Sequence, residues 1–199
     1  MYKSHNMDNY KVIVDDIGMS PVTYKMTRRF LILLFFVINV ICANAQIQRL
    51  FMGFTLGVST KTQIENQLKA RHKKYRIVND NCIAIEDVTF VGLFWPSTYV
   101  RFYKNTFYSV SFSVTAYDLG SLDALDNYWG NLSSLLRRKY NNYIMKQTDT
   151  SYYYTDMKTD LMLYTDYERK SVGLVKYMTL VYYDRKLDAK QSIKEMNEL

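Results

Sequence analysis

The chain holds few residues of the types that perform acid–base or transition-metal chemistry. It has 2 His and 2 Cys in 199 residues, whereas a zinc site takes three or four His, Cys or carboxylate ligands. His72 stands between Arg71 and the pair Lys73-Lys74, where we expect a solvated helix end. The sequence therefore predicts no metal and no cofactor, and for His72 it favours a surface position over the role of a catalytic base.

Carboxylates are the remaining candidates for catalysis. Asp156, Asp160, Asp166 and Glu168 follow one another along a single strand–turn region. A calcium loop places several oxygen ligands at regular spacing around a Gly, and this region has no such pattern. Asp123 stands near the start of a predicted helix, where its charge complements the helix dipole. A hydrolase with paired carboxylates stays open as an alternative.

Tyrosine is the most distinctive residue type of the chain. It occurs 19 times, and adjacent rings in a strand, such as Tyr182 and Tyr183, must face opposite sides of the sheet. An exposed Tyr combines an apolar ring with a polar tip, which suits protein interfaces and stacking on sugar rings. Tyr is also a good strand former on the wet face of an ordinary sheet. The candidate binding residues are Tyr152, Tyr154, Tyr164, Tyr167, Tyr177, Tyr183 and Trp95.

Two helices and several strands must position these side chains. Residues 59–74 place Ile64 and Leu68 four apart after Ser59, an expected N-cap, and residues 121–140 carry Leu and Trp at spacings of three and four. Residues 107–114 alternate Ser with larger side chains, so Tyr108 and Val110 are expected on the buried face of a strand that follows a turn at 104–106. The strands are predicted at 82–85, 88–95, 99–103, 107–114, 151–154, 160–164 and 172–183.

The order of these elements recurs along the chain. Three pairs are each 65 residues apart: Tyr99 with Tyr164, Val110 with Val175, and Phe112 with Tyr177. This offset suggests an internal duplication. We therefore predict an α+β fold of two tandem helix-plus-antiparallel-sheet repeats, with the helices packed on one face of the sheet. The repeats cover about 50–118 and 119–186 of a single domain, 46–199, which ends in a charged tail.

An export signal is predicted ahead of this domain. Arg28 and Arg29 precede the apolar run 30–41, and Ala43-Asn44-Ala45 supplies the small residues that a signal peptidase needs. A helix of that run is too short to cross a bilayer. We expect a signal peptide at 26–45, cleavage before Gln46 and no stable membrane span afterwards. Residues 1–25 precede it and are expected to be an extension from a mis-assigned start.

Export constrains the partners and the remaining thiol. Cleavage removes Cys42 and leaves Cys82 alone, which we expect to be a buried small hydrophobe. The full chain has a formal net charge of +7, and the loss of Arg28 and Arg29 with the signal makes the mature chain only mildly basic. The basic runs 69–76 and 137–139 fall at predicted helix ends, where cations are favoured. No nucleic-acid partner is therefore expected.

The start of the first predicted helix carries a resemblance. Gly57-Val58-Ser59, Gln63-Ile64 and Leu68 resemble the helix-opening pattern of small periplasmic proteins with the beta-lactamase-inhibitor-like fold, which include small lipoproteins of outer-membrane assembly. The resemblance implies a helix followed by antiparallel strands, sometimes in tandem, and binding to other proteins without catalysis. In this chain Lys69-Ala70-Arg71 stands where that family has Gly-x-Pro, and Ile41 before Cys42 does not fit a lipobox.

These observations give one expected function and two alternatives. We expect a non-enzymatic protein, exported to the periplasm or beyond the cell, that binds an envelope protein through a Tyr-rich sheet face. The first alternative binds a glycan, or hydrolyses envelope polysaccharide with carboxylates. The second is a structural envelope protein without a ligand.

Overall fold

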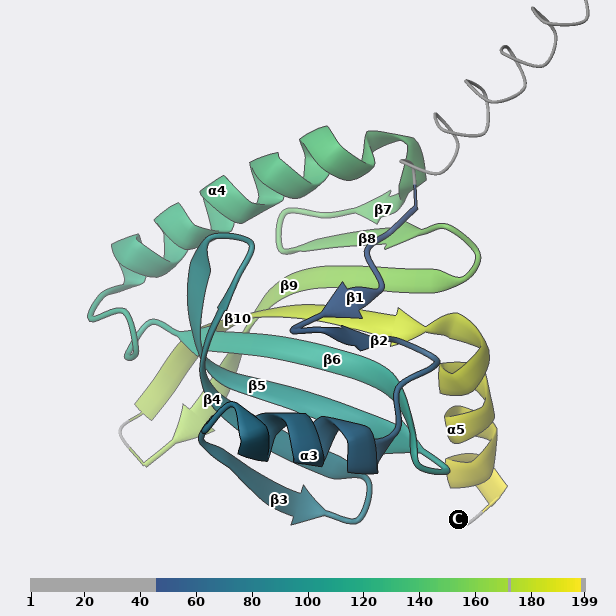
Figure 1. Ribbon diagram of the computed structural model, residues 1–199. Coiled ribbons are helices and arrows are strands. Elements are labelled where there is room, and N and C mark those ends of the chain that lie inside the picture. Colours follow the sequence, from purple (N-terminus) through teal and green to yellow (C-terminus); the bar gives the residue numbers. More distant parts are fainter. Residues whose placement is uncertain (1–45, 172, 198–199) are drawn as a thin grey trace, which may run out of the picture. The chain divides into compact units, whose positions relative to one another are not determined.

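The structure, a computed structural model, describes residues 46–171 and 173–197. The predicted extension at 1–25 and the predicted signal peptide at 26–45 lie outside the described residues. Within the described part, an antiparallel sheet of eight strands has the order β3-β4-β5-β6-β10-β9-β8-β7 (Figure 1). Its strands are β3 (Tyr75–Asn79), β4 (Cys82–Phe90), β5 (Leu93–Tyr103), β6 (Thr106–Thr115), β7 (Ile144–Gln147), β8 (Ser151–Thr155), β9 (Thr159–Lys170) and β10 (Gly173–Asp184).

The prediction of two tandem helix-plus-antiparallel-sheet repeats is wrong. β6 and β10, the last strands of the two predicted repeats, pair with each other from Tyr177↔Thr115 to Tyr183↔Ser109, so one sheet runs through both segments. The offset of 65 residues also joins positions that are not equivalent. Phe112 is fully buried in the core, whereas Tyr177 lies on the opposite face of the sheet. The chain contains 19 Tyr, so residues that match at one offset arise by chance.

Two helices cover one face of the sheet. In α3 (Lys61–Ala70) the N-cap is Thr60, which forms a capping box with Gln63. The predicted N-cap, Ser59, instead accepts a hydrogen bond from the backbone N–H of Thr55, so the helix starts later than expected. α4 (Leu122–Tyr140) agrees with its prediction, and Ser121 caps it by accepting from the N–H of Ala124 at 3.1 Å. A short 3₁₀ turn, η1 (141–143), follows it.

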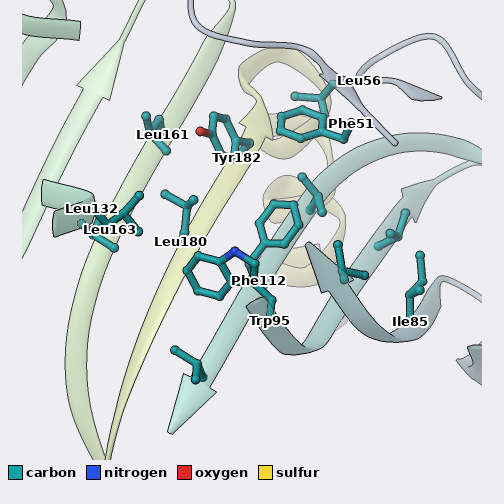
Figure 2. Close-up of a cluster of buried hydrophobic side chains, with 14 of the residues drawn as sticks. Phe51, Leu56, Ile85, Trp95, Phe112, Leu132, Leu161, Leu163, Leu180 and Tyr182 are labelled. Atoms are coloured by element: carbon teal, nitrogen blue, oxygen red, sulfur yellow. The ribbon is translucent and has the colours of Figure 1, made fainter. Parts of the chain in front are cut away.

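Between these helices and the sheet lies an aromatic core. A small ribbon of β1 (Leu50–Phe51) and β2 (Phe54–Thr55) covers it from the same side (Figure 1). The Phe112 ring stacks on Phe90 with centroids 4.4 Å apart and contacts Trp95 at 5.6 Å. Figure 2 shows Trp95 and Phe112 together at the centre of this cluster. Apolar burial of this extent supplies most of the free energy that stabilises a sheet-and-helix fold.

A third helix, α5 (Arg185–Asn197), is the second departure from the predicted fold. It contributes no buried residue to the core. Gln191 and Glu195 instead border a hollow on the other face of the sheet, beside Tyr99 and Arg101. The helices therefore do not all pack on one face: α5 follows β10 directly, and its apolar residues Ile193 and Met196 are exposed. No helix in the described residues is long and apolar enough to span a membrane.

The segment at the start of the described residues is tied to the C-terminal half. The backbone N–H of Ile47 donates to Asp156 at 2.9 Å. Arg49 forms an ion pair of 2.5 Å with Asp184, whose other carboxylate oxygen accepts from the N–H of Leu187 in α5. Gly57 has φ +79°, and a Cβ there would collide with the Asp184 carboxylate. This position therefore requires glycine both for its backbone conformation and for space.

Candidate binding face

The sheet face opposite α3 and α4 is called the open face here, and alternate residues of the central strands build it. In β6 these are Ser109, Ser111 and Ser113, because Val110 and Phe112 point into the core. Directly opposed residues of neighbouring strands share a face. The registers therefore give the rest of the face: Tyr99 and Arg101 on β5, Tyr177, Thr179, Val181 and Tyr183 on β10, and Tyr164 on β9.

A bulge changes the face of one predicted core residue. Arg101 pairs with Ser109 but Phe102 pairs with Phe107, so Tyr108 is an extra residue in β6. Such a bulge reverses the alternation on one side of it. Phe107 takes the core position, and Tyr108 joins the open face, which corrects the prediction that Tyr108 shares the buried face with Val110.

Small hydroxyl side chains form the floor of the open face, and aromatic rings stand along it. Ser113 and Thr179 are linked across β6 and β10 at 3.2 Å between their hydroxyl oxygens. The Tyr164 and Tyr177 rings meet edge to face with centroids 6.2 Å apart. Ser111 accepts a hydrogen bond from the Arg101 guanidinium at 3.3 Å. The face thus presents hydroxyl groups and fixed rings together.

Hollows join along this face. The largest, called the tyrosine groove, has a volume of about 710 Å³ and runs between the end of β6 and the β9–β10 hairpin. A second, of about 370 Å³, lies around Arg101 and Tyr183, and a third, of about 600 Å³, reaches α5. All three are lined by Tyr99, so they form one connected surface. The tyrosine groove is lined by Ser97, Tyr99, Ser113, Thr115, Tyr117, Asp118, Tyr167, Glu168, Lys170, Ser171, Val175 and Tyr177.

The structure divides the seven predicted binding residues between the two sides of the sheet. Tyr164, Tyr177 and Tyr183 lie on the open face, and Tyr167, 54% exposed, lines the tyrosine groove. The remaining three, Trp95, Tyr152 and Tyr154, are buried in the core. These three belong to the packing under the helices, as the contact of Tyr152 with Trp129 of α4 illustrates.

Sequence reasoning missed four residues of this surface: Tyr99, Arg101, Tyr108 and Tyr117. Tyr99 is flanked by Thr98 and Val100, both buried, so the alternation of β5 would have placed Tyr99 and Arg101 outward. Nothing in the sequence indicates the Tyr108 bulge. Tyr117, 80% exposed, follows β6 in a loop, where strand alternation makes no prediction.

Two carboxylates, Asp118 and Glu168, line the tyrosine groove, and Asp118 accepts hydrogen bonds from the backbone N–H and the hydroxyl of Thr115. The side chain of Asp156 stabilises a turn: it accepts hydrogen bonds from the backbone N–H groups of Lys158 and Thr159, at 3.0 and 2.7 Å. Glu168 forms an ion pair with Lys170 at 3.3 Å. Among the described residues there is no group of three His, Cys, Asp or Glu that could hold a metal ion. His72 is exposed. Cys82 is a buried free thiol. Burial raises the pKa of this thiol, and the positive charge of Arg101 offsets part of the increase.

Burial also raises the pKa of several tyrosines. For Tyr154 in the core and Tyr183 on the open face, the pKa rises to about 12, chiefly by loss of hydration. Tyr182 is fully buried, and its pKa lies well above the ordinary value of 10.0. In the first turn of α5, burial and, to a lesser extent, repulsion from Asp160 raise the pKa of Asp188. Rings that resist ionisation keep their donor hydrogen throughout the physiological range.

These shifts predict delayed ionisation in alkali. The folded-state pKa of Tyr154 and Tyr183 is about 12, above the value of about 10 in an unfolded chain. Their contribution to stability is complete below pH 10 and is lost as the pH rises towards 12. A titration by tyrosinate absorbance should show a late phase that merges with unfolding. The same titration in guanidinium should show one early phase, and a single early phase in the folded protein would contradict the prediction.

Comparison with known proteins identified no relative of this chain. No protein-family model matches the chain, and neither the curated proteins nor the solved structures include a match. The resemblance at Gly57–Ser59, Gln63 and Leu68 stays a prediction.

Proposed function

We propose that this chain is an exported, non-catalytic protein of the cell envelope that binds a partner protein through its open face. The observation that carries the proposal is the composition of that face, where Tyr rings surround a floor of Ser and Thr hydroxyls. Antibody combining sites use the same mixture. Tyr supplies large rigid contact area at low entropic cost, and Ser supplies adaptable hydrogen bonds.

The extent of the face supports a protein partner. α3, α4 and the β1–β2 ribbon all cover the other side of the sheet, and α5 packs against part of the open face, in contact with β5, β6 and β10. A specific protein interface needs about 800 Å² on each partner. The connected hollows extend as an open surface over β5, β6, β10 and β9, whereas small-molecule sites are usually enclosed.

A glycan is the second candidate, and the tyrosine groove is the observation that favours it. Tyr99, Tyr117, Tyr167 and Tyr177 line this groove together with the acidic side chain of Glu168. Aromatic faces stack on sugar rings, and carboxylates accept from sugar hydroxyls. A protein partner would be recovered together with the chain, whereas a glycan-binding chain would be recovered without a partner protein, so one experiment separates the two candidates.

The test is cross-linking in the cell followed by recovery of the tagged chain from the envelope fraction. We expect a partner protein in stoichiometric amount, and Tyr177→Ala should weaken its binding by about 30-fold or more, as at an interface hot spot. Val58→Ala is the matched control, because Val58 is 69% exposed and lies outside the open face. Sequencing of the recovered chain should begin at Gln46.

Two results would contradict the protein-binding proposal. One is recovery of the chain alone, together with a fluorescence response of its tyrosines to an envelope polysaccharide, which would support the glycan candidate. The other is equal binding of the partner by wild type and Tyr177→Ala at the same thermal stability. Recovery from the cytoplasm would contradict export.

A further inference from the structure

Within the part of the chain that the structure describes, the edge of the sheet at β3 has no neighbouring strand. β3 pairs only with β4, and it is the lowermost strand of the sheet in Figure 1. The strand is exposed from Arg76 to Asn79, and two of its apolar side chains, Ile77 and Val78, are 57% and 42% exposed. Natural sheets usually protect such an edge.

The backbone of β3 presents hydrogen-bonding groups at this edge. The carbonyl of Lys74 accepts from the N–H of Glu86, so Lys74 directs its polar groups towards β4. In an antiparallel pair the direction alternates along the strand. Arg76 therefore also bonds towards β4, while the N–H and C=O groups of Tyr75 and Ile77 point to the free edge. An extended peptide can pair with these groups by strand addition.

The segment that leads into β3 is strongly basic, and the exposed acidic residues Glu86 and Asp87 lie on the neighbouring strand β4. Lys69, Arg71, Lys73 and Lys74 lead into the strand, which itself carries Arg76, and all five are exposed. Arg71 donates to the carbonyl of Met52. In the described part of the chain, the other four cations form no ion pair. The only acidic residue of the segment 69–80 is Asp80, at its far end.

We propose that the free edge of β3 binds an extended, acidic segment of a partner protein by β-strand addition. Backbone pairing with Tyr75 and Ile77 gives the affinity, and the cations of 69–76 select acidic sequences by charge complementarity. A second copy of the chain fits less well, because edge-to-edge pairing brings two strongly basic segments together. This surface lies at the sheet edge, and its use does not depend on the open face.

Ile77→Pro tests the backbone contribution. A proline at this position removes an N–H that points to the free edge, which an edge strand tolerates. The probe is a short fluorescent peptide in which Glu alternates with Val, followed by anisotropy. We expect saturable binding to wild type and to the control Ile77→Val, and a loss of about tenfold or more for Ile77→Pro. Circular dichroism and thermal melting show whether Ile77→Pro is folded.

Charge reversal tests the selectivity and does not depend on the proline variant folding. We expect the double variant Lys73→Glu and Lys74→Glu to bind the Glu–Val peptide about tenfold more weakly than wild type does. The control Lys190→Glu, in α5, should leave it unchanged. A peptide in which Lys alternates with Val should not bind. Tyr177→Ala should bind the Glu–Val peptide as wild type does, which separates failure here from failure of the proposed function.

Several outcomes would overturn the proposal. The first is the absence of saturable binding of the Glu–Val peptide. The cations would then serve to protect the edge of the sheet from pairing with other strands. The second is equal binding by a folded Ile77→Pro. The third is a dimer of wild type that Ile77→Pro abolishes, which would make a second copy the occupant. The fourth is binding to vesicles of anionic lipid, unchanged in Ile77→Pro, without binding of the peptide.

Discussion

Phe112→Ala lowers the free energy of unfolding by about 4 kcal/mol, the result expected for removing a fully buried aromatic side chain. Phe112 is 0% exposed, and its ring contacts Phe90, Trp95 and Phe51. Truncation would remove these contacts and leave a cavity that neighbouring strands cannot fill without moving. Denaturant unfolding of wild type and variant measures the difference.

The matched control is Ser113→Ala, one residue further along β6 and on the open face. It removes only the hydroxyl contact with Thr179, so its cost should stay near 1 kcal/mol or below. If both variants lost the same stability, the two faces of β6 would not differ as the structure requires. A loss below about 1 kcal/mol for Phe112→Ala would place the ring outside the core.

Asp184→Ala should lower the free energy of unfolding by about 3 kcal/mol. Asp184 is 8% exposed and holds Arg49 at 2.5 Å, while its second oxygen accepts from the N–H of Leu187. Breaking a buried ion pair leaves the partner charge uncompensated, which costs about 3–5 kcal/mol. Arg49 keeps hydrogen bonds to Leu56 and Thr159, so the lower end of that range applies.

Asp184→Asn separates the charge from the helix cap. Its amide oxygen still accepts from Leu187, so α5 keeps its first turn while the ion pair is lost. We expect Asp184→Asn to lose less stability than Asp184→Ala does. The helical signal in circular dichroism should fall only in Asp184→Ala, because only this variant loses the cap of α5. Wild-type stability in both variants would show that Arg49 and Asp184 do not hold the two ends of the described chain together.

Local pattern predicted most strands of the fold, and it failed at both sheet edges and at the turn between β4 and β5. The turn at Lys104 and Asn105 was predicted, and both residues have positive φ, 45° and 68°. β3 and β7 were not predicted, because β3 has no clean alternation and β7 spans four residues only. The strand expected at 88–95 is two strands, since Gly92 turns the chain between β4 and β5.

The binding face was harder to predict than the core, because its members depend on strand register. The run Tyr152-Tyr153-Tyr154 looks the same in either register, and only pairing with β9 sends Tyr152 and Tyr154 inward. A one-residue shift would reverse all three. Tyr164 lies between Leu163 and Thr165, and Tyr177 lies between Lys176 and Met178, so their neighbours did not distinguish them from Tyr152 and Tyr154. The chemistry of the chain was therefore readable, but its placement was not.

Pairing of β6 with β10 also fixes when the protein can fold during its synthesis. The two strands are joined at the centre of the sheet although α4 and three other strands separate them in the chain. Contacts of such long sequence separation form slowly. In a nascent chain that ends before β10, the strands β6 and β9 both lack the neighbour that lies between them in the complete sheet. Such a chain has to be kept from aggregating until its last strand is made.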